Sequence, residues 1–571
     1  MTATPGWDVI VVGAGHNGLT AGALLARAGL ATLVVEAREV IGGCCVTEEI
    51  APGCRASTTS YIASMLRPEV IRALDLGRHG LRMVACEPAL QVALDDGEVL
   101  ADWNDPARTA AGISRYSPAD ARAFASVHAE LAHLAARLQP LFTELPPDTR
   151  ATGVRRLTEA VRMGRHLRGL RGTDVEGLTQ MLTGSLGQFI DARFESRPAK
   201  ALLLANNLYG KHGGPYQPGT LIGLAFHLLT GGEDAVPGFF GHVMGGMGAI
   251  SDAIAASGQA HGMQIRTGVP VARIRVTGGR ADGVTLASGE ELTARVVLSG
   301  ADPKQTFLHL VDQADLPADF RAAVAGITMD GPCAKVNLVL DAEPQVRGMP
   351  ADAGPGQRAL FTLPPDLAVA DACYDRAKRG ELADAEQLFV DCVVASTVDP
   401  SLAPEGRHIM TCFVQYVPYR LAEGTWDSRR DELGDRVLAR IAQFVPGVPG
   451  TVLARQVLTP LDLERDYGLT EGNIFHGDIA PGQLFHMRPV PGWARYATPV
   501  PGLYLCGAGA HPGGGVTGAP GYNAAHRVLA EFRRADRRRS SLGRSSRGRA
   551  ERGGADRGRS DRGRSERRLA S

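Results

Sequence analysis

The chain has 571 residues, of which 44% are hydrophobic and 21% are charged, as in ordinary globular proteins. This length exceeds what a single core supports and indicates two or three domains. The net charge of zero excludes a chain that is basic or acidic throughout, but from Arg533 onward 15 Arg face five acidic residues, so that segment carries +10 and the remainder −10.

The N-terminus reaches its first expected strand near Asp8, which leaves no room for a signal peptide. We therefore expect a cytoplasmic protein, either free or at the periphery of a membrane. The nine cysteines are odd in number and include no CxxC pair, which predicts reduced thiols.

The first element reads as a strand, a glycine turn and a helix. An apolar run from Val9 to Val12 breaks at Gly13, Gly15 and Gly18, and an alanine-rich stretch follows. The first glycine permits a tight turn, the second lets backbone N–H groups approach a diphosphate, and the third lets the helix pack on the strand. The pattern predicts a dinucleotide diphosphate at the helix N-terminus, where unpaired N–H groups favour negative charge.

A second apolar run over residues 31–35 ends on Glu36, 23 residues after the first glycine of the turn. An acid at this spacing is suited to accept hydrogen bonds from ribose hydroxyls. The alternative, a membrane-spanning segment, fails because His16, Asn17 and Arg27 interrupt the run before about 20 apolar residues accumulate.

The middle of the chain is predicted to be mainly helical. Apolar and polar residues alternate over 81–100 and predict a hairpin, and Ser117 followed by Pro predicts a helix start. Helical periodicity continues to about Leu204. The loop 209–216 mixes aromatic residues with Lys and His, so it either lines a substrate pocket or only turns the chain.

From residue 237 the pattern returns to short strands. A glycine cluster at 245–248 precedes an expected helix over 249–258, and 271–276 reads as one of several strands. Residues 310–470 mix strands with a helix at 431–444, which is consistent with a sheet-bearing second domain.

The last expected folded segment is a second strand, glycine turn and helix. The strand covers 503–506, and the helix begins near Gly518. Pro512 stands where a second GxGxxG would need its third glycine, so no second dinucleotide fingerprint is present. The arginine-rich segment beyond it predicts a disordered tail.

Together these segments resemble the phytoene desaturase-like FAD oxidoreductases. The resemblance rests on the opening glycine turn, Glu36, the Gly42–Gly43 pair, the 245–248 cluster and the segment LYLCGAGAHPGGGVTGAPGYNAA. The stretch 473–492 resembles the branch named after pyridine nucleotide-disulfide oxidoreductase domain-containing protein 2. The likeness covers roughly residues 5–310 and 465–531.

This resemblance implies an α/β fold like that of amine oxidases and phytoene desaturases: a discontinuous Rossmann-type FAD-binding domain with an inserted α+β substrate domain. The FAD-binding parts are expected at 1–95, 237–310 and 471–535. The substrate domain is expected to have a largely helical part at 96–236 and a sheet part at 311–470, with the arginine-rich tail at 536–571.

The resemblance also implies contacts with FAD. Gly13, Gly15 and Gly18 would hold the diphosphate, Glu36 the adenosine ribose, Gly42 and Gly43 the other side of the diphosphate, Val271 the adenine, and Gly507, Gly515, Val516 and Thr517 the ribityl chain and isoalloxazine. A helix N-terminus near Gly518 would stabilise the negative charge of reduced flavin.

The family label suggests disulfide reduction, but the sequence argues against it because it has neither a redox-active cysteine pair nor a second dinucleotide fingerprint. The leading hypothesis is an FAD-dependent dehydrogenase or desaturase that oxidises a C–C bond of a small apolar, isoprenoid-like substrate by hydride transfer to flavin N5. His511 is the first candidate for a catalytic role, with a turn-stabilising role as its alternative. Arg488 and Tyr209 are weaker candidates.

Three other functions stay open: a flavin amine oxidase, a regulatory or interaction protein that retains FAD structurally, and an isomerase that uses reduced flavin. The electron acceptor and the oligomeric state are open as well, and no metal site is expected. The arginine-rich tail is compatible with contacts to anionic membranes or nucleic acid, or with a plain solvated tail. It lacks aromatic residues that would stack on bases.

Overall fold

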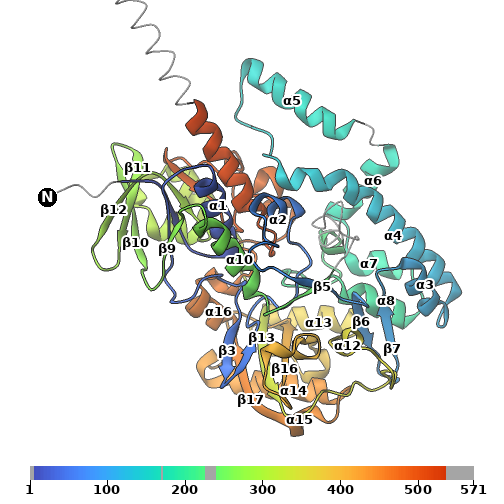
Figure 1. The fold of residues 1–571 in the computed structure, drawn as a ribbon. Helices are drawn as coiled ribbons and strands as arrows, with labels where there is room; N and C mark the ends of the chain where they lie inside the picture. Colours follow the sequence, from blue (N-terminus) through green and yellow to red (C-terminus); the bar gives the residue numbers. More distant parts are fainter. Residues whose placement is uncertain (1–5, 169–170, 225–239, 535–571) are drawn as a thin grey trace, which may run out of the picture. The chain divides into compact units, whose positions relative to one another are not determined.

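The computed structural model describes residues 6–168, 171–224 and 240–534 (Figure 1). Residues 1–524 form one compact unit, and residues 525–571 form a second, of which the described part, 525–534, is helical. The predicted tail at 536–571 lies outside the described residues. Within the first unit, two seven-stranded sheets carry the fold.

The first sheet is a parallel sheet with an antiparallel extension. Its order is β10-β11-β12-β1-β2-β9, and β18 pairs with β12. Strands β9, β2, β1, β12 and β18 run parallel. The strands are β1 (Trp7–Val12), β2 (Thr32–Val35), β9 (Gln264–Arg266), β10 (Val271–Thr277), β11 (Arg280–Leu286), β12 (Glu291–Ser299) and β18 (Leu503–Leu505). The sheet therefore joins strands from the start, middle and end of the chain, and the expected Rossmann-type α/β fold is confirmed.

Helices α1 (His16–Arg27) and α10 (Gly248–Gln259) pack against each other beside this sheet (Figure 1). Small residues allow the approach: a Cβ atom at Gly258 would lie 3.1 Å from the Cα of Ala23. Both helices follow a glycine turn, as the sequence pattern predicts.

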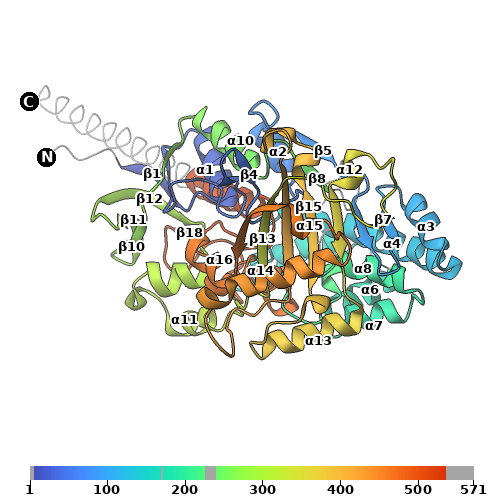
Figure 2. The ribbon, with the colours of Figure 1, turned by 90° about the horizontal axis from the view of Figure 1, so that it is seen from below.

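The second sheet has the order β17-β13-β16-β15-β14-β6-β7. Its strands are β6 (Leu90–Ala93), β7 (Val99–Asp102), β13 (Cys333–Leu340), β14 (Leu360–Leu363), β15 (Phe389–Val394), β16 (His408–Gln415) and β17 (Val452–Leu458). Every residue of β13 and β15 is buried, so both faces of the sheet centre are covered. Helix α14 (Trp426–Ala442) packs against β15 and β17, and Figure 2 shows it running along the sheet.

The hairpin expected over residues 81–100 forms between β6 and β7, whereas β5 (Met83–Ala85) pairs with β8 (Gly241–Val243). The expected domain boundary at residue 95 falls inside the β6–β7 hairpin, which belongs to the second sheet.

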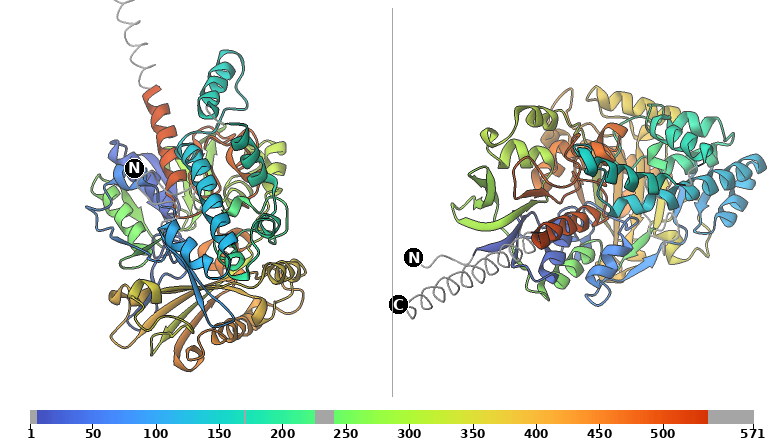
Figure 3. Two further views of the ribbon diagram at one scale, coloured as in Figure 1. Left: turned by 90° about the vertical axis from the view of Figure 1, so that its right-hand side faces the viewer. Right: turned by 90° about the horizontal axis from the view of Figure 1, so that it is seen from above.

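A helical segment lies between β7 and β8. Its described helices are α3 (Pro106–Ser114), α4 (Pro118–Leu138), α5 (Gly153–Leu167), α6 (Gly172–Thr183), α7 (Leu186–Asp191) and α8 (Arg197–Ala205). The predicted cap at Ser117 is confirmed, because its hydroxyl accepts a hydrogen bond from the Asp120 backbone N–H at 3.1 Å. Helix α5 stands away from its neighbours (Figures 1 and 3).

The remaining named elements connect these layers. They are α2 (Pro68–Leu74), α11 (Ala318–Ala325), α12 (Pro355–Arg358), α13 (Leu367–Lys378), α15 (Val448–Thr451), α16 (Pro460–Tyr467), β3 (Glu48–Ala51) and β4 (Cys54–Ala56). All nine cysteines are free thiols, as expected. Among the described residues, no helix is both long and apolar enough to cross a bilayer.

Candidate functional site

A cavity of about 490 Å³ lies where strands β1, β2 and β12 end. Parallel sheets bind ligands at the carboxyl ends of their strands, because loops and helix N-termini converge there. The residues that follow these three strands, Gly13, Glu36 and Gly300, all line the cavity. The second sheet contributes another wall of the cavity.

The glycine turn after β1 adopts the conformation that its sequence predicts. Gly13 has a φ of +94°, which L residues rarely adopt, and a Cβ atom at Gly18 would lie 2.2 Å from the carbonyl oxygen of Gly13. A Cβ atom at Gly15, in contrast, would meet nothing within 4 Å. The turn therefore holds α1 close to β1 and leaves open space at the helix N-terminus, where no side chain caps the helix.

The Gly42–Gly43 pair packs directly on this turn. The Gly42 N–H donates to the Ala14 carbonyl oxygen at 2.8 Å, and Gly42 forms a parallel bridge with Gly15. Gly43 has a φ of +58°, and a Cβ atom there would lie 3.2 Å from the Gly15 Cα. A Cβ atom at Gly42 would lie 2.3 Å from the Cys45 carbonyl oxygen, so neither position readily accepts a side chain, and both glycines line the cavity.

The carboxylate of Glu36 is buried at the end of β2. One oxygen accepts the Ala14 N–H at 2.7 Å and the other accepts the Arg38 N–H at 2.9 Å. A carboxylate has about four acceptor positions, so these two bonds orient the group and leave capacity for a ligand's hydroxyl groups.

The last strand adds a third glycine-rich wall. A Cβ atom at Gly507 would lie 2.3 Å from the Gly300 carbonyl oxygen, so the backbones after β12 and β18 are in contact. Farther along, the Gly515 carbonyl oxygen lies 3.2 Å from His16 Nε2. Burial lowers the pKa of His16 to about 4, so its neutral ring donates this bond and fixes the loop against α1.

The structure brings ten of the eleven predicted FAD-contacting residues to this one cavity. They are Gly13, Gly15, Gly18, Glu36, Gly42, Gly43, Val271, Gly507, Gly515 and Val516. The eleventh, Thr517, is buried and does not line the cavity; its hydroxyl accepts the Ala519 N–H at the start of the last helical segment. The individual contacts of these residues with FAD stay predictions.

The candidate catalytic residue His511 lies outside the cavity lining. Its Nε2 atom bonds to the Leu141 carbonyl oxygen at 2.8 Å, and its ring packs edge-on to Phe485. Burial lowers the pKa of His511 to about 4. This geometry fits the alternative, a histidine that stabilises the turn. The catalytic role stays a prediction, and His511 does not line the cavity in which catalysis would occur.

Arg488 also lies outside the lining and is fully buried. Its guanidinium donates to five backbone carbonyl oxygens, those of Phe475, Gly477, Asp478, Gln483 and Ala508. Phe475 and Ala508 line the cavity. Arg488 therefore positions two cavity walls through their backbones.

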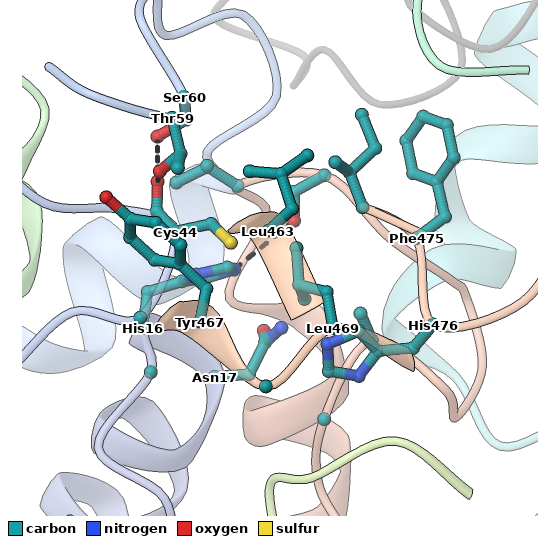
Figure 4. A pocket seen from close by; sticks show the side chains of 18 of the residues that line it. His16, Asn17, Cys44, Thr59, Ser60, Leu463, Tyr467, Leu469, Phe475 and His476 are labelled. Carbon is teal, nitrogen blue, oxygen red and sulfur yellow. Dashed lines mark hydrogen bonds between the residues drawn. The ribbon is translucent and has the colours of Figure 1, made fainter. Parts of the chain in front are cut away.

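Side chains from α1 and from the loop after α16 meet inside the cavity. Figure 4 shows His16 and Asn17 on one side and Leu469 and His476 on the other. Near the Gly42–Gly43 pair, the hydroxyls of Thr59 and Ser60 both donate to the Cys44 carbonyl oxygen at 2.6 Å (Figure 4). These bonds hold the cavity wall that follows the glycine pair.

The wall formed by the second sheet contains Lys335, which is not among the residues predicted from the sequence. Lys335 lies in β13, is buried, and lines the cavity. Its Nζ atom lies 3.8 Å from the ring centroid of Tyr61 and has no hydrogen-bond partner among the described residues. Burial lowers the pKa of Lys335 to about 8, because the apolar surroundings disfavour its charge.

An aromatic group surrounds this lysine. The Tyr61 hydroxyl donates to the buried Asp391 carboxylate at 2.6 Å, and Thr362 donates to the other carboxylate oxygen at 2.6 Å. The Phe413 ring lies near both Tyr61 and Tyr209. Tyr209, a weaker candidate from the sequence, thus lines the cavity with these residues. The sequence does contain a signal for Lys335. This lysine lies inside an apolar run that predicts a buried strand, and lysines are almost never fully buried without a partner.

These features fit FAD. The open space at Gly15 and the bare N-terminus of α1 suit a diphosphate, and Glu36 retains acceptor capacity for ribose hydroxyls. The glycine-rich walls would admit a flat ring system close to the backbone. The side chains that would contact a substrate come from the second sheet and the loop after α16.

Comparison with known proteins agrees with this reading. The family model described as flavin containing amine oxidoreductase matches residues 18–529. The chain is 39% identical to pyridine nucleotide-disulfide oxidoreductase domain-containing protein 2 of Rattus norvegicus, over 93% of this chain and 94% of that protein. It is 27% identical to hydroxyneurosporene desaturase of Cereibacter sphaeroides, over 93% and 99%.

Among solved structures, cyclohexylamine oxidase from Brevibacterium oxydans is similar with a TM-score of 0.53 and 18% identity, covering 93% of this chain and all of that one. At this identity the likeness shows the shared fold. The resemblance stated from the sequence is confirmed, and the cofactor is FAD. The chain belongs to the flavin containing amine oxidoreductase family and is an FAD-dependent oxidoreductase.

Proposed function

We propose that this enzyme removes hydrogen from a C–C bond of an apolar substrate. The proposal rests on the charges of the cavity. Among the described lining residues, Glu36 is the only carboxylate, and both its oxygens accept backbone N–H groups. The lysine and arginine residues that line the cavity are Arg38, Lys211 and Lys335.

This arrangement disfavours a cationic substrate. An ammonium ion is usually held by a carboxylate or over an aromatic face. Here Lys335 Nζ already lies over the Tyr61 ring, so this aromatic face is occupied and is not available to the ammonium group of a substrate. Aromatic and aliphatic side chains, including Phe413, Ile474 and Phe475, suit an apolar molecule instead.

FAD, when bound, supplies the oxidising chemistry by accepting two electrons and one hydrogen as hydride. Removal of a second hydrogen to leave a C=C bond releases a proton, which needs an acceptor. Lys335 Nζ is the group of this chain that we assign to that role, because Lys335 lines the cavity and its Nζ atom has no hydrogen-bond partner among the described residues. Its lowered pKa, about 8, increases the neutral fraction that can accept a proton.

The hydrogen bond between Tyr61 and Asp391 positions the aromatic ring that contacts Lys335. Asp391 fixes the phenol of Tyr61, and the ring of Tyr61 in turn contacts Lys335 Nζ. Tyr61 and Asp391 are therefore positioning residues in this proposal.

Amine oxidation is the second candidate, supported by the family description and by the fold shared with cyclohexylamine oxidase. The name hydroxyneurosporene desaturase, among the relatives, supports desaturation.

The test is anaerobic mixing of the purified protein with isoprenoids, acyl compounds and amines while the flavin absorbance is recorded. Bleaching by isoprenoids, with a product two hydrogens lighter, supports the proposal. Bleaching by amines alone overturns it, and bleaching by no donor supports a regulatory protein that retains FAD structurally.

A further inference from the structure

Apolar side chains are exposed in an uneven way on this molecule. Of the eight large hydrophobic residues that the described chain exposes, five lie on α5 and α6: Val154, Leu157, Val161, Val175 and Leu182. On α5 the exposed fractions reach 79% for Val154, 66% for Leu157 and 52% for Val161. Such clustering on one segment marks an interaction surface.

The three apolar residues of α5 form a single stripe. They are spaced by three and four residues, which places them on one face of a helix that turns about 100° per residue. Glu159 lies on nearly the opposite face, where its carboxylate accepts a hydrogen bond from Arg495 at 2.8 Å. Arg162 donates to the Leu145 carbonyl oxygen at 2.7 Å. One face of α5 is thus anchored, and the apolar stripe points away from the anchor.

Cationic side chains lie beside and behind the stripe: at about 100° per residue, Arg165 borders it, while Arg155 and Arg156 lie about 130° from its centre, one on each side. Arg155, Arg156 and Arg165 are exposed, and their guanidinium groups form no salt bridge with any residue that the structure describes. Glu159 is the only acidic residue of α5 and is engaged by Arg162 and Arg495. Arginine side chains are long enough to reach around a helix toward anionic groups beside its apolar stripe, so α5 is complementary to a surface that is both apolar and negatively charged.

We propose that α5 docks this enzyme on the surface of a bilayer that contains anionic lipids. The stripe would enter the boundary between headgroups and acyl chains, and the arginines would contact lipid phosphates. Duplex nucleic acid would satisfy the arginines but leave the stripe in water. A second copy of the chain would cover the stripe but bring like charges together. The inference does not depend on the proposed reaction, although an apolar substrate would dissolve in the same bilayer.

The experiment is flotation of the full-length, FAD-loaded protein with phosphatidylcholine vesicles, with or without phosphatidylglycerol. We expect binding to the anionic vesicles that weakens at high salt. The triple variant Val154→Ser/Leu157→Ser/Val161→Ser should reduce this binding at least about tenfold, because it removes the side chains that would be buried. Leu453→Ser is the matched control, since Leu453 is 49% exposed on β17 and outside the helical segment.

A second measurement does not depend on loss of binding. In Leu157→Trp, the tryptophan emission should shift to shorter wavelength on anionic vesicles more than in the unsubstituted protein. A variant that ends at residue 534 should keep both the binding and its dependence on the stripe.

Four results would overturn the proposal: no binding to anionic vesicles, equal binding by the triple variant, loss of binding on removal of the tail alone, or an effect of the triple variant on oligomeric mass or DNA retention instead. Retained flavin absorbance shows that each variant is folded.

Discussion

The two walls of the cavity are built on different principles. At the ends of β1, β12 and β18 the wall consists of backbone, and glycines such as Gly18 and Gly507 are required because a Cβ atom would collide with a neighbouring carbonyl. On the second sheet the wall consists of side chains, with Lys335 held over Tyr61. Local spacing in the sequence places the glycines within each strand-and-turn unit of the first wall, whereas the side chains of the second wall come together only in the fold.

The largest effect is expected from Gly18→Ala. The new Cβ atom would lie 2.2 Å from the Gly13 carbonyl oxygen, so α1 would have to move away from β1. We expect loss of bound FAD, seen as a colourless protein, and a decrease of about 1–3 kcal/mol in the free energy of unfolding. Gly77→Ala is the control, because a Cβ atom there meets nothing within 4 Å. Normal FAD content in Gly18→Ala would show that FAD binding does not require the close packing of α1 on β1.

Lys335→Met tests the side-chain wall. We expect unchanged FAD content and a rate of anaerobic flavin reduction lower by about 10²- to 10⁴-fold, the usual contribution of a general base. In the unsubstituted protein the rate should rise as pH increases through about 8, because Lys335 accepts a proton only when neutral. This rise should be absent from the variant.

The control for that substitution is Lys378→Met, since Lys378 is 43% exposed and pairs with Asp375 on the surface. If the pH profile is the same in Lys335→Met and in the unsubstituted protein, another group accepts the proton from the substrate.

Glu36→Gln should have an effect of intermediate size. It should weaken the binding of FAD and change nothing else. Both oxygens of Glu36 accept backbone N–H groups. In the variant, the amide NH₂ group would face one of these N–H donors, and the negative charge would be lost. We expect FAD to bind apoprotein about ten- to a hundredfold more weakly, as for loss of a hydrogen bond to a charged group. Fluorescence titration measures this, and unchanged affinity would remove Glu36 from the ribose contact.

The smallest effect on rate is expected from His511→Gln. Its lost hydrogen bond to Leu141 should lower the free energy of unfolding by about 1 kcal/mol, while flavin reduction at saturating FAD stays within about twofold. Chemical denaturation and stopped-flow spectroscopy give the two quantities. A hundredfold slower reduction with a shifted pH profile would instead support the catalytic role that the sequence suggested.

These contrasts explain what the sequence could predict. The β1–α1–β2 unit, the α10 helix and the predicted roles of Gly13, Gly15, Gly18 and Glu36 followed from glycine spacing and strand patterns, because each depends on residues close in the chain. The other predicted cofactor residues followed from the family resemblance, and the structure places all of them except Thr517 on the same cavity. Lys335, Tyr61 and Asp391 are separated by more than 50 residues from one another. Lys335 and Asp391 are each in register with Phe413 in the second sheet, and Tyr61 reaches them from the segment after β4. His511 was selected for its position beside a glycine turn, but its ring packs away from the cavity toward Leu141.

The central claim is that the second-sheet wall selects an apolar C–C donor for the flavin. The most direct measurement is anaerobic stopped-flow mixing of the FAD-loaded protein with a cyclic monoterpene and, separately, with cyclohexylamine, a donor of similar ring size. The account predicts that the monoterpene bleaches the flavin absorbance while cyclohexylamine leaves it unchanged. Bleaching by cyclohexylamine, with none by the monoterpene, would contradict it.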